Sequence, residues 1–283
     1  MEFRKIGRIH TGQDGAVWGD LLFRFDANGK CYVYDRTLDP HGADWPLFSE
    51  FWLGGRQTEI PHSNSVSFSR EYYCETDEFP LLFTNVYNNC ATQEDRREGV
   101  CCVYRLLRQE NQFTADLVAT VEIDFVKDGS LWASPNGADI RPYGNFVVDR
   151  ENRKLIVFTM RDEPQTTRYF CFPLPEVAGS GQKITLTKSD VEFFFDCPYH
   201  HFIQGACIKG HMLYSLEGFT DNLTNPPAMR VISLADRKQE ACILFKDYGL
   251  SVEPELIDFA GDTCYYCDHA GNVYTVDFKE NVW

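Results

Sequence analysis

Residues 252–278 read VEPELIDFAGDTCYYCDHAGNVYTVDF, and this stretch decides the fold. Three short segments rich in Leu, Ile, Val, Phe and Tyr are separated by the turn signals AGD and HAGN, which predicts three β-strands joined by tight turns. The rest of the chain repeats this pattern in groups of four strands, and helical periodicity is nearly absent. The last group therefore lacks one strand, and FRKIGRI at residues 3–9 is the segment that can supply it.

Each group of strands opens after a polar cluster, and these openings recur along the chain. The markers of the five openings are Asp14, Asn64, Asn145, Gln204 and Glu255. The intervals between successive markers are 50, 81, 59 and 51 residues, and the longest one contains predicted loops at 87–98 and 127–143. A unit of roughly 50 residues that repeats along the chain indicates a repeat architecture. Four-stranded units that repeat radially form a β-propeller.

The sequence thus predicts a single all-β domain, a five-bladed β-propeller with four antiparallel strands per blade. The N-terminal strand completes the last blade and closes the ring, so no long strand edge is left unpaired. The third blade takes the run 184–195 as its fourth strand. The predicted blades are 10–53, 62–125, 141–196, 200–248, and 252–278 with strand 3–9.

Two other arrangements compete with five blades. Seven blades would average about 40 residues, as in WD repeats, but no Gly-His…Trp-Asp pattern recurs here, whereas five units average about 57 residues. Two packed β-sandwiches remain the alternative.

The chain resembles the five-bladed β-propellers over essentially its full length. The stretches Arg141-Pro-Tyr-Gly-Asn-Phe146 and Phe202-Ile-Gln-Gly205, together with Tyr214-Ser-Leu-Glu-Gly-Phe219, look like repeat openings of uncharacterised bacterial propeller proteins. No stretch closely matches an enzyme family with assigned catalytic residues. The resemblance therefore implies a fold and no catalytic residue.

Charge and cysteine content limit the function and the compartment. The 42 acidic and 27 basic residues give a net charge of −15, which disfavours binding to nucleic acid or to a membrane surface. We expect no membrane span and no secretory signal, because neither an apolar run of about 20 residues nor an N-terminal apolar region is present. The eleven cysteines are an odd number within apolar segments, which favours buried thiols in a reducing cytoplasm.

Cys264 and Cys267 form a C-x-x-C motif, which can bind zinc or act as a redox pair in other folds. Here the motif lies on a predicted strand, where residues three apart point to opposite faces. We therefore expect the two thiols not to meet.

Propellers generally place the start of each first strand at the end of the channel where ligands bind. If this chain follows that plan, its scattered polar residues converge there and bind a small polar ligand, a carbohydrate first. The predicted ligand-binding residues are Gln13, Asp14, His62, Asn64, Arg141, Tyr143, Asn145, His201, Gln204 and Glu255. Glu253 is expected just above the ring of markers, and His269 lies in a turn-like stretch where we expect it to be solvated. The structural alternative is that such residues bind channel water and cap backbone groups.

Three further functions remain open, and whether the protein is an enzyme is not decided. A glycoside hydrolase needs two carboxyl groups, for which Asp14 and Glu217 come first, followed by Glu255 and Asp139, although the Asp-Pro opening of many five-bladed glycosidases is absent. A ring of channel oxygens could hold calcium or magnesium, but no dedicated metal-binding loop is present, so no cofactor is predicted. A protein-interaction scaffold would use the charged loop 88–99, with an unknown partner.

Overall fold

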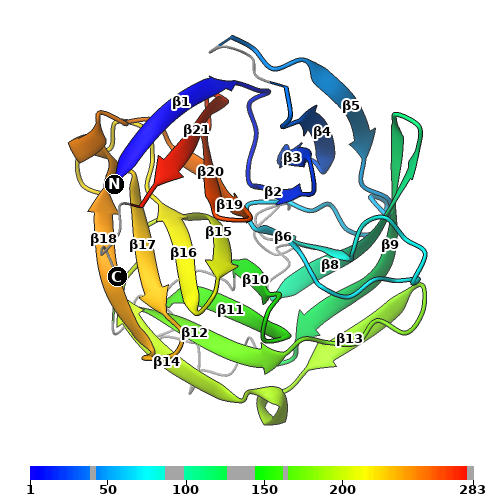
Figure 1. Cartoon of the computed structure of the whole chain (residues 1–283). Helices are drawn as coiled ribbons and strands as arrows, with labels where there is room; N and C mark the ends of the chain where they lie inside the picture. Colours follow the sequence, from blue (N-terminus) through cyan, green and yellow to red (C-terminus); the bar gives the residue numbers. More distant parts are fainter. Residues whose placement is uncertain (39–42, 87–98, 126–143, 162–164, 279–283) are drawn as a thin grey trace.

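The computed structural model describes residues 1–38, 43–86, 99–125, 144–161 and 165–278, and these form five twisted β-sheets around a central axis (Figure 1). Each sheet contains a run of four antiparallel strands, and the order of the sheets around the axis follows the chain. The protein is a five-bladed β-propeller, which confirms the predicted fold.

The strands of each blade are given from the axis outward. Blade 1 contains β2 (Gly15–Trp18), β3 (Leu21–Phe25), β4 (Lys30–Asp35) and β5 (Leu47–Trp52). Blade 2 contains β6 (Val66–Phe68), β7 (Leu82–Asn85), β8 (Val100–Gln109) and β9 (Gln112–Ile123). Blade 3 contains β10 (Asn145–Asp149), β11 (Lys154–Arg161), β12 (Thr166–Pro173) and β14 (Phe193–Pro198). Blade 4 contains β15 (Ile203–Lys209), β16 (Met212–Glu217), β17 (Ala228–Ser233) and β18 (Lys238–Leu244), and blade 5 contains β19 (Pro254–Ala260), β20 (Thr263–Asp268), β21 (Asn272–Asp277) and β1 (Glu2–Arg8).

The hydrophobic core lies between the blades. Among the described residues it divides into five clusters, one at each seam between neighbouring blades. At the seam of blades 1 and 2, for example, Phe23 meets Phe68 and Phe79 edge to face, with ring centroids 5.3 and 5.7 Å apart. A single blade cannot bury both of its faces, so each blade depends on its two neighbours for stability. The ring is therefore the folding unit.

The N-terminal strand closes the ring as predicted. β1 pairs antiparallel with β21, with Glu2 opposite Asp277 and Arg8 opposite Asn272. Phe3 anchors this pairing, because its ring packs against four aromatic rings from blades 4 and 5 at centroid distances of 5.3–6.4 Å. The outer strand of blade 5 is thus the first strand of the chain (Figure 1).

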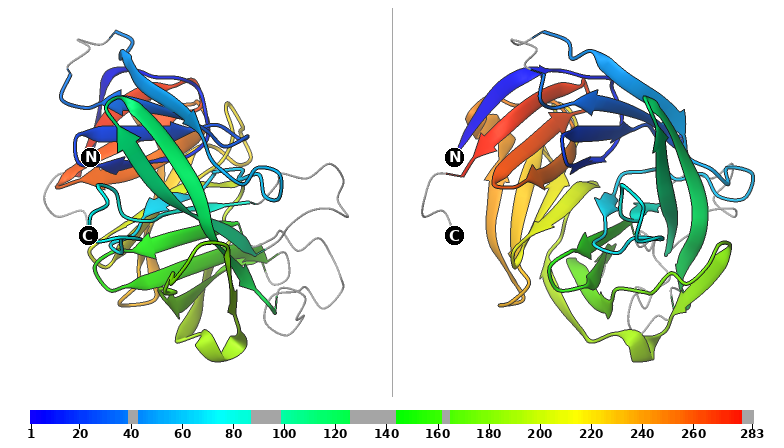
Figure 2. Two further views of the ribbon diagram at one scale, coloured as in Figure 1. Left: turned by 90° about the vertical axis from the view of Figure 1, so that its right-hand side faces the viewer. Right: turned by 45° about the vertical axis from the view of Figure 1, so that its right-hand side comes forward.

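The run 184–195 is the place where the sequence prediction is wrong. It is not one strand of blade 3: β13 (Gln182–Leu186) pairs in parallel with β9 of blade 2, and the chain returns through a 3-10 turn (Lys188–Asp190) to β14 of blade 3. β13 covers the outer edge of β9, and Leu186 is buried in the core between blades 2 and 3. Burial of the Leu186 side chain and pairing of the open edge of β9 both stabilise this arrangement. The apolar run is therefore divided between two blades, although it is continuous in the sequence. In Figure 2, the end of β5 also lies beside β9, where Leu53 and Ala115 form a parallel bridge.

The cysteines behave as expected of buried thiols. All ten described cysteines are free, and eight of them are buried. Cys264 packs in the core between blades 4 and 5, whereas Cys267 packs in the core between blades 5 and 1, so the C-x-x-C thiols point to opposite faces. Within the described ranges, no helix is long and apolar enough to cross a membrane.

The ring closure can be tested at Phe3. Phe3→Ala removes a half-buried ring from the seam between blades 4 and 5, so we expect the free energy of unfolding to fall by about 2 kcal/mol, less than the roughly 3–5 kcal/mol of a fully buried Phe. Denaturant unfolding measures this change. Leu223→Ala, at a side chain that is 98 % exposed, is the control and should leave the midpoint unchanged. Equal midpoints for the two variants would contradict the anchoring role of Phe3.

Candidate functional site at the channel mouth

Side-chain hydrogen bonds cross all five seams near the axis, and we call the side chains that make them the polar belt. From blade 1 onward, Val66 N donates to Asp14 Oδ2 (2.8 Å), Ser65 Oγ to Phe146 O (3.0 Å), Asn145 Nδ2 to Gln204 O (2.6 Å), Gln204 Nε2 to Glu253 Oε1 (2.6 Å), and Val17 N to Asp258 Oδ2 (2.8 Å). Most of these bonds satisfy backbone groups of the next blade, which would otherwise be buried without a partner.

Hydrogen bonds to backbone groups near the axis occupy three of the predicted ligand-binding residues. Asp14, Asn64 and Asn145 are all buried, and Asn64 Nδ2 donates to Ile203 O at 3.3 Å. Burial raises the pKa of Asp14 well above its ordinary value. These residues meet near the axis as predicted, and their hydrogen bonds match the alternative in which they cap backbone groups.

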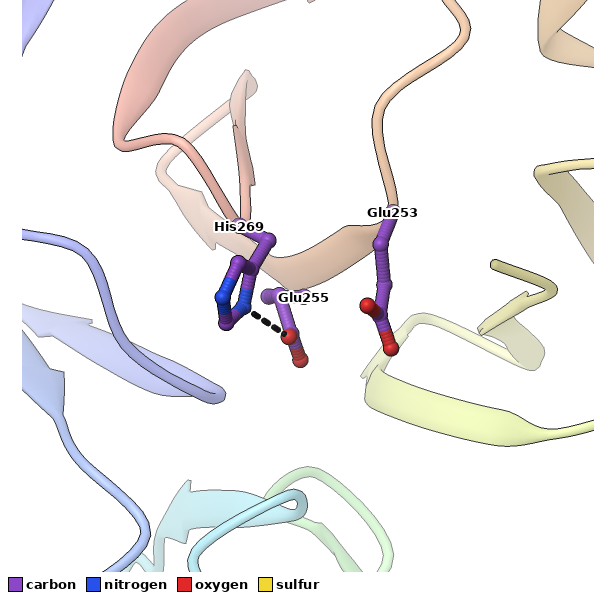
Figure 3. A group of neighbouring side chains, drawn as sticks. All are labelled: Glu253, Glu255 and His269. Carbon is purple, nitrogen blue, oxygen red and sulfur yellow. Dashed lines mark hydrogen bonds and ion pairs between the residues drawn. The ribbon is translucent and has the colours of Figure 1, made fainter. Parts of the chain in front are cut away.

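A group of three side chains lies at one mouth of the channel, where the innermost strands begin: Glu253, Glu255 and His269 (Figure 3). His269 Nδ1 lies 2.9 Å from Glu255 Oε1. One carboxylate oxygen from each glutamate and one ring nitrogen of His269 all lie within 4.8 Å of one another. Glu255 is 0 % exposed at its side chain while His269 is 51 % exposed, so the group leads from the surface to a buried carboxylate.

Local strand geometry creates this arrangement. Pro254 pairs with Asp268 and Leu256 with Cys267, which leaves Glu255 as the extra residue of a β-bulge. A bulge redirects a side chain relative to the regular alternation of the strand. His269 follows directly after β20, and its backbone N–H donates to Glu253 O at 2.8 Å. Two neighbours hold the carboxylates: Gln204 binds Glu253, and Gln13 Nε2 donates to Glu255 Oε1 at 3.4 Å.

The pKa values of all three groups are raised, but not by the same cause. Burial, followed by the charge of Glu255, raises the pKa of Glu253 to about 7. Burial also raises the pKa of Glu255, although His269 and the buried Arg24 oppose this effect. The hydrogen bond from His269 to Glu255 raises the pKa of the imidazole. The mouth therefore holds two carboxyl groups and one imidazole at close range, a set of groups that suits a cation or a hydrogen-bond donor.

The other predicted site residues lie apart from this group or outside the described residues. Glu217 ends β16 and is bound by Arg230 Nε (2.9 Å) and His201 N (3.1 Å), so this carboxylate has its own partners. His62 is half-buried, and its backbone N–H donates to Asn85 O at 3.0 Å. Asp139, Arg141 and Tyr143 lie outside the described residues.

His269 is the functional candidate that sequence reasoning missed, since it was placed in a solvated turn. The spacing of the sequence does carry a signal that pairs His269 with Glu255. Glu255 and His269 are each about seven residues from the turn at Gly261–Asp262, and an antiparallel hairpin places such positions opposite each other. Glu253 was expected just above the ring of markers, and in the structure it lies close to Glu255, the marker of blade 5.

A surface hollow of about 590 Å³ opens at the other end of the innermost strands, between Trp18 and Phe259. Two arginines line it, but both are anchored by protein groups: Arg150 pairs with Asp258 at 3.2 Å, and Arg36 Nη1 donates to Tyr265 Oη at 2.8 Å. No predicted site residue lines this hollow, so the candidate site remains the opposite mouth.

No protein-family model and no curated protein matches this chain. Similar solved structures include the Pan2 WD40 domain of Neurospora crassa, with 7 % identity, 98 % of this chain and 82 % of that chain covered, and a TM-score of 0.47. The computationally designed protein Ika8 is 6 % identical over 96 % of this chain and 99 % of its own, with a TM-score of 0.37. BamB of Moraxella catarrhalis is 8 % identical over 95 % of this chain and 58 % of its own, with a TM-score of 0.35. The fold assignment therefore rests on the strand pairing of the protein itself.

The crowding at the axis gives a test of the belt. A Cβ at Gly205 would lie 2.0 Å from Glu255 O and 2.5 Å from Asp14 Oδ1, so Gly205→Ala forces the backbones of blades 4 and 5 apart. We expect the free energy of unfolding to fall by about 3 kcal/mol. Gly179→Ala is the matched control, because nothing lies within 4 Å of its Cβ, and the change there should stay within about 0.5 kcal/mol. Chemical denaturation distinguishes the two, and a harmless Gly205→Ala would refute the close packing of the axis.

A buried histidine that follows β14 predicts how stability depends on pH. His200 lies 3.0 Å from Tyr169 Oη through Nε2, and burial lowers its pKa well below the ordinary value. The folded state keeps this imidazole neutral, whereas the unfolded chain binds a proton below about pH 6.5. Stability should therefore fall as the pH drops below that value, by up to about 1.4 kcal/mol per pH unit from this group.

His200→Gln should flatten this dependence, and His211→Gln, at an exposed histidine, should preserve it. Unfolding curves between neutral and mildly acidic pH measure both slopes. Identical slopes in the wild type and in His200→Gln would show that His200 is not held neutral.

Proposed function

We propose that the protein is a binding module that takes a small polar ligand at the channel mouth, a hydroxyl-rich compound of the carbohydrate class first. The observation that carries the proposal is the convergence of two carboxylates and an imidazole at one mouth, with the buried Glu255 behind the accessible His269. These groups offer more acceptors than donors. They therefore suit a ligand that donates hydrogen bonds through hydroxyl or ammonium groups.

An exposed aromatic ring supports the same ligand class. Thr220 Oγ1 accepts a hydrogen bond from Glu253 N at 2.9 Å, and the neighbouring Phe219 is 38 % exposed with its ring 4.1 Å from that of Phe202. A ring beside a cluster of acceptors can pack against the apolar face of a sugar while the acceptors bind its hydroxyl groups.

A hydrolase finds less support in the geometry. Asp14 and Glu217, the first catalytic candidates, are both buried, and each binds protein groups. Glu253 and Glu255 are close together, but the side chain of Glu255 is fully covered, whereas the nucleophile of a retaining glycosidase must reach the sugar carbon.

The propeller fold is also consistent with a protein-interaction scaffold. Phe219 and the highly exposed Leu223 lie on one loop beside the mouth and give this second candidate a specific surface. The proposed setting for either function is a reducing cytoplasm, which the ten free cysteines of the described residues support.

Binding is tested with three probes, glucose, glucosamine and N-acetylglucosamine, by saturation-transfer NMR in the presence of EDTA. We expect glucosamine to bind best, with a dissociation constant of about 1 mM, because it carries both hydroxyl groups and an ammonium group. Glu253→Gln should weaken glucosamine at least tenfold, since it removes a charged acceptor.

The matched control is Glu240→Gln on the outer strand β18, which should bind glucosamine as the wild type does. Absence of saturable binding by all three probes, or equal affinity in Glu253→Gln, would overturn the proposal.

A further inference from the structure

We propose that Glu253, Glu255 and His269 form a binding site for one divalent metal ion of the zinc type. This inference goes beyond the proposed function, because it requires no polar ligand. It also differs from the sequence expectation of calcium or magnesium in a ring of oxygen atoms, since the group at the mouth contains an imidazole nitrogen.

The distances suit a small ion. Zinc binds imidazole nitrogen and carboxylate oxygen at about 2.0–2.2 Å, which puts neighbouring ligand atoms roughly 3.4 Å apart. The three ligand atoms already lie within 4.8 Å of one another, and His269 Nδ1 and Glu255 Oε1 are 2.9 Å apart. The separation of the ligand atoms must shrink by at most roughly 1.4 Å to reach this spacing, and Glu253 is only partly buried. Figure 3 shows the side chains of His269, Glu255 and Glu253 side by side.

A second observation points to a ligand at this place. Glu255 is 0 % exposed, and its Oε2 has no hydrogen-bond partner among the residues that the structure describes. A buried carboxylate oxygen without a partner loses its solvation with no compensation. A metal ion bound by Glu255 compensates for this loss directly.

The residues around Glu253 and Glu255 can orient the two carboxylates as metal ligands. Gln204 donates to Glu253 at 2.6 Å, and Gln13 donates to Glu255 at 3.4 Å, so both carboxylates are oriented by amide groups. Hydrogen bonds of this kind fix ligand orientation in metal sites. The buried Arg24 offsets part of the negative charge near Glu255. Asp14 lies close to Arg24, and Asp268 lies close to Glu255. The carboxylates still outnumber the cations, so a divalent ion reduces the charge imbalance.

The donor set discriminates between metals. Calcium takes six to eight oxygen ligands, about twice what this group supplies, and does not favour imidazole. One imidazole and two carboxylates are common ligands of zinc, and sites with three protein ligands leave a position open for water or another oxygen ligand. We therefore expect zinc to bind more tightly than calcium.

The experiment is calorimetric titration of the EDTA-treated full chain, after removal of the EDTA, with zinc chloride and then calcium chloride. We expect one zinc ion per chain, a higher melting temperature with zinc, and at least tenfold weaker binding of calcium. His269→Gln, at an exposed side chain, should weaken zinc at least 100-fold, and Gln204→Ala should weaken it about tenfold through the loss of orientation.

A spectroscopic measurement separates ligation from a general structural effect. Cobalt bound in place of zinc should give visible absorption bands that change in His269→Gln, because the imidazole nitrogen is lost from the metal. His211→Gln and Glu240→Gln are the matched controls and should keep both the stoichiometry and the spectrum. Since Glu255→Gln alters a fully buried position and can prevent folding, His269→Gln is the decisive variant.

Two results would overturn the site: no zinc binding at millimolar concentration, or one-to-one binding that His269→Gln leaves unchanged. Either failure is distinguishable from failure of the proposed function, because the sugar titration is carried out with EDTA present.

Discussion

The close approach of the innermost strands at the axis is the constraint on which the rest of the structure depends. At Gly205 the backbone of the next blade occupies the space that a side chain would need. Backbone groups in so narrow a space cannot all reach water, and an unsatisfied buried group costs about 1–3 kcal/mol. Short polar side chains that bind the neighbouring backbone solve this problem, and the same kind of residue therefore recurs at the start of each blade.

The candidate site follows from one exception in the polar belt. At three seams the belt joins a side chain to the backbone of the next blade near the start of the innermost strands, but between blades 4 and 5 Gln204 binds the side chain of Glu253. The bulge at Glu255 adds a second carboxylate at the same seam, and the end of β20 adds His269. The candidate site therefore lies at the seam where the belt joins two side chains, rather than a side chain and a backbone group.

The sequence predicts the ring well because its signals are local and repeated. Apolar segments between turn residues reveal the strands, and the missing strand of the last blade reveals the closure. β13 could not be predicted in this way, because it pairs with a blade already completed some sixty residues earlier, and its apolar run continues into β14. Of the residues at the candidate site, Gln13, Gln204 and Glu255 were predicted from the sequence, because their positions depend on where strands start. The sequence could not show that Asp14 is buried while Glu253 is partly exposed, because burial depends on how closely the innermost strands approach one another at the axis.

The pairing of β1 with β21 sets the order in which the protein can mature. β1 precedes the other strands in the chain and β21 follows them, so β1 has no partner in its sheet until β21 has been synthesised. The fifth sheet and its seams with blades 4 and 1 cannot form before that point, so the ring closes last. The exposed edge of the fifth sheet and the aromatic surface around Phe3 are therefore the parts of the nascent chain that most need protection by a chaperone.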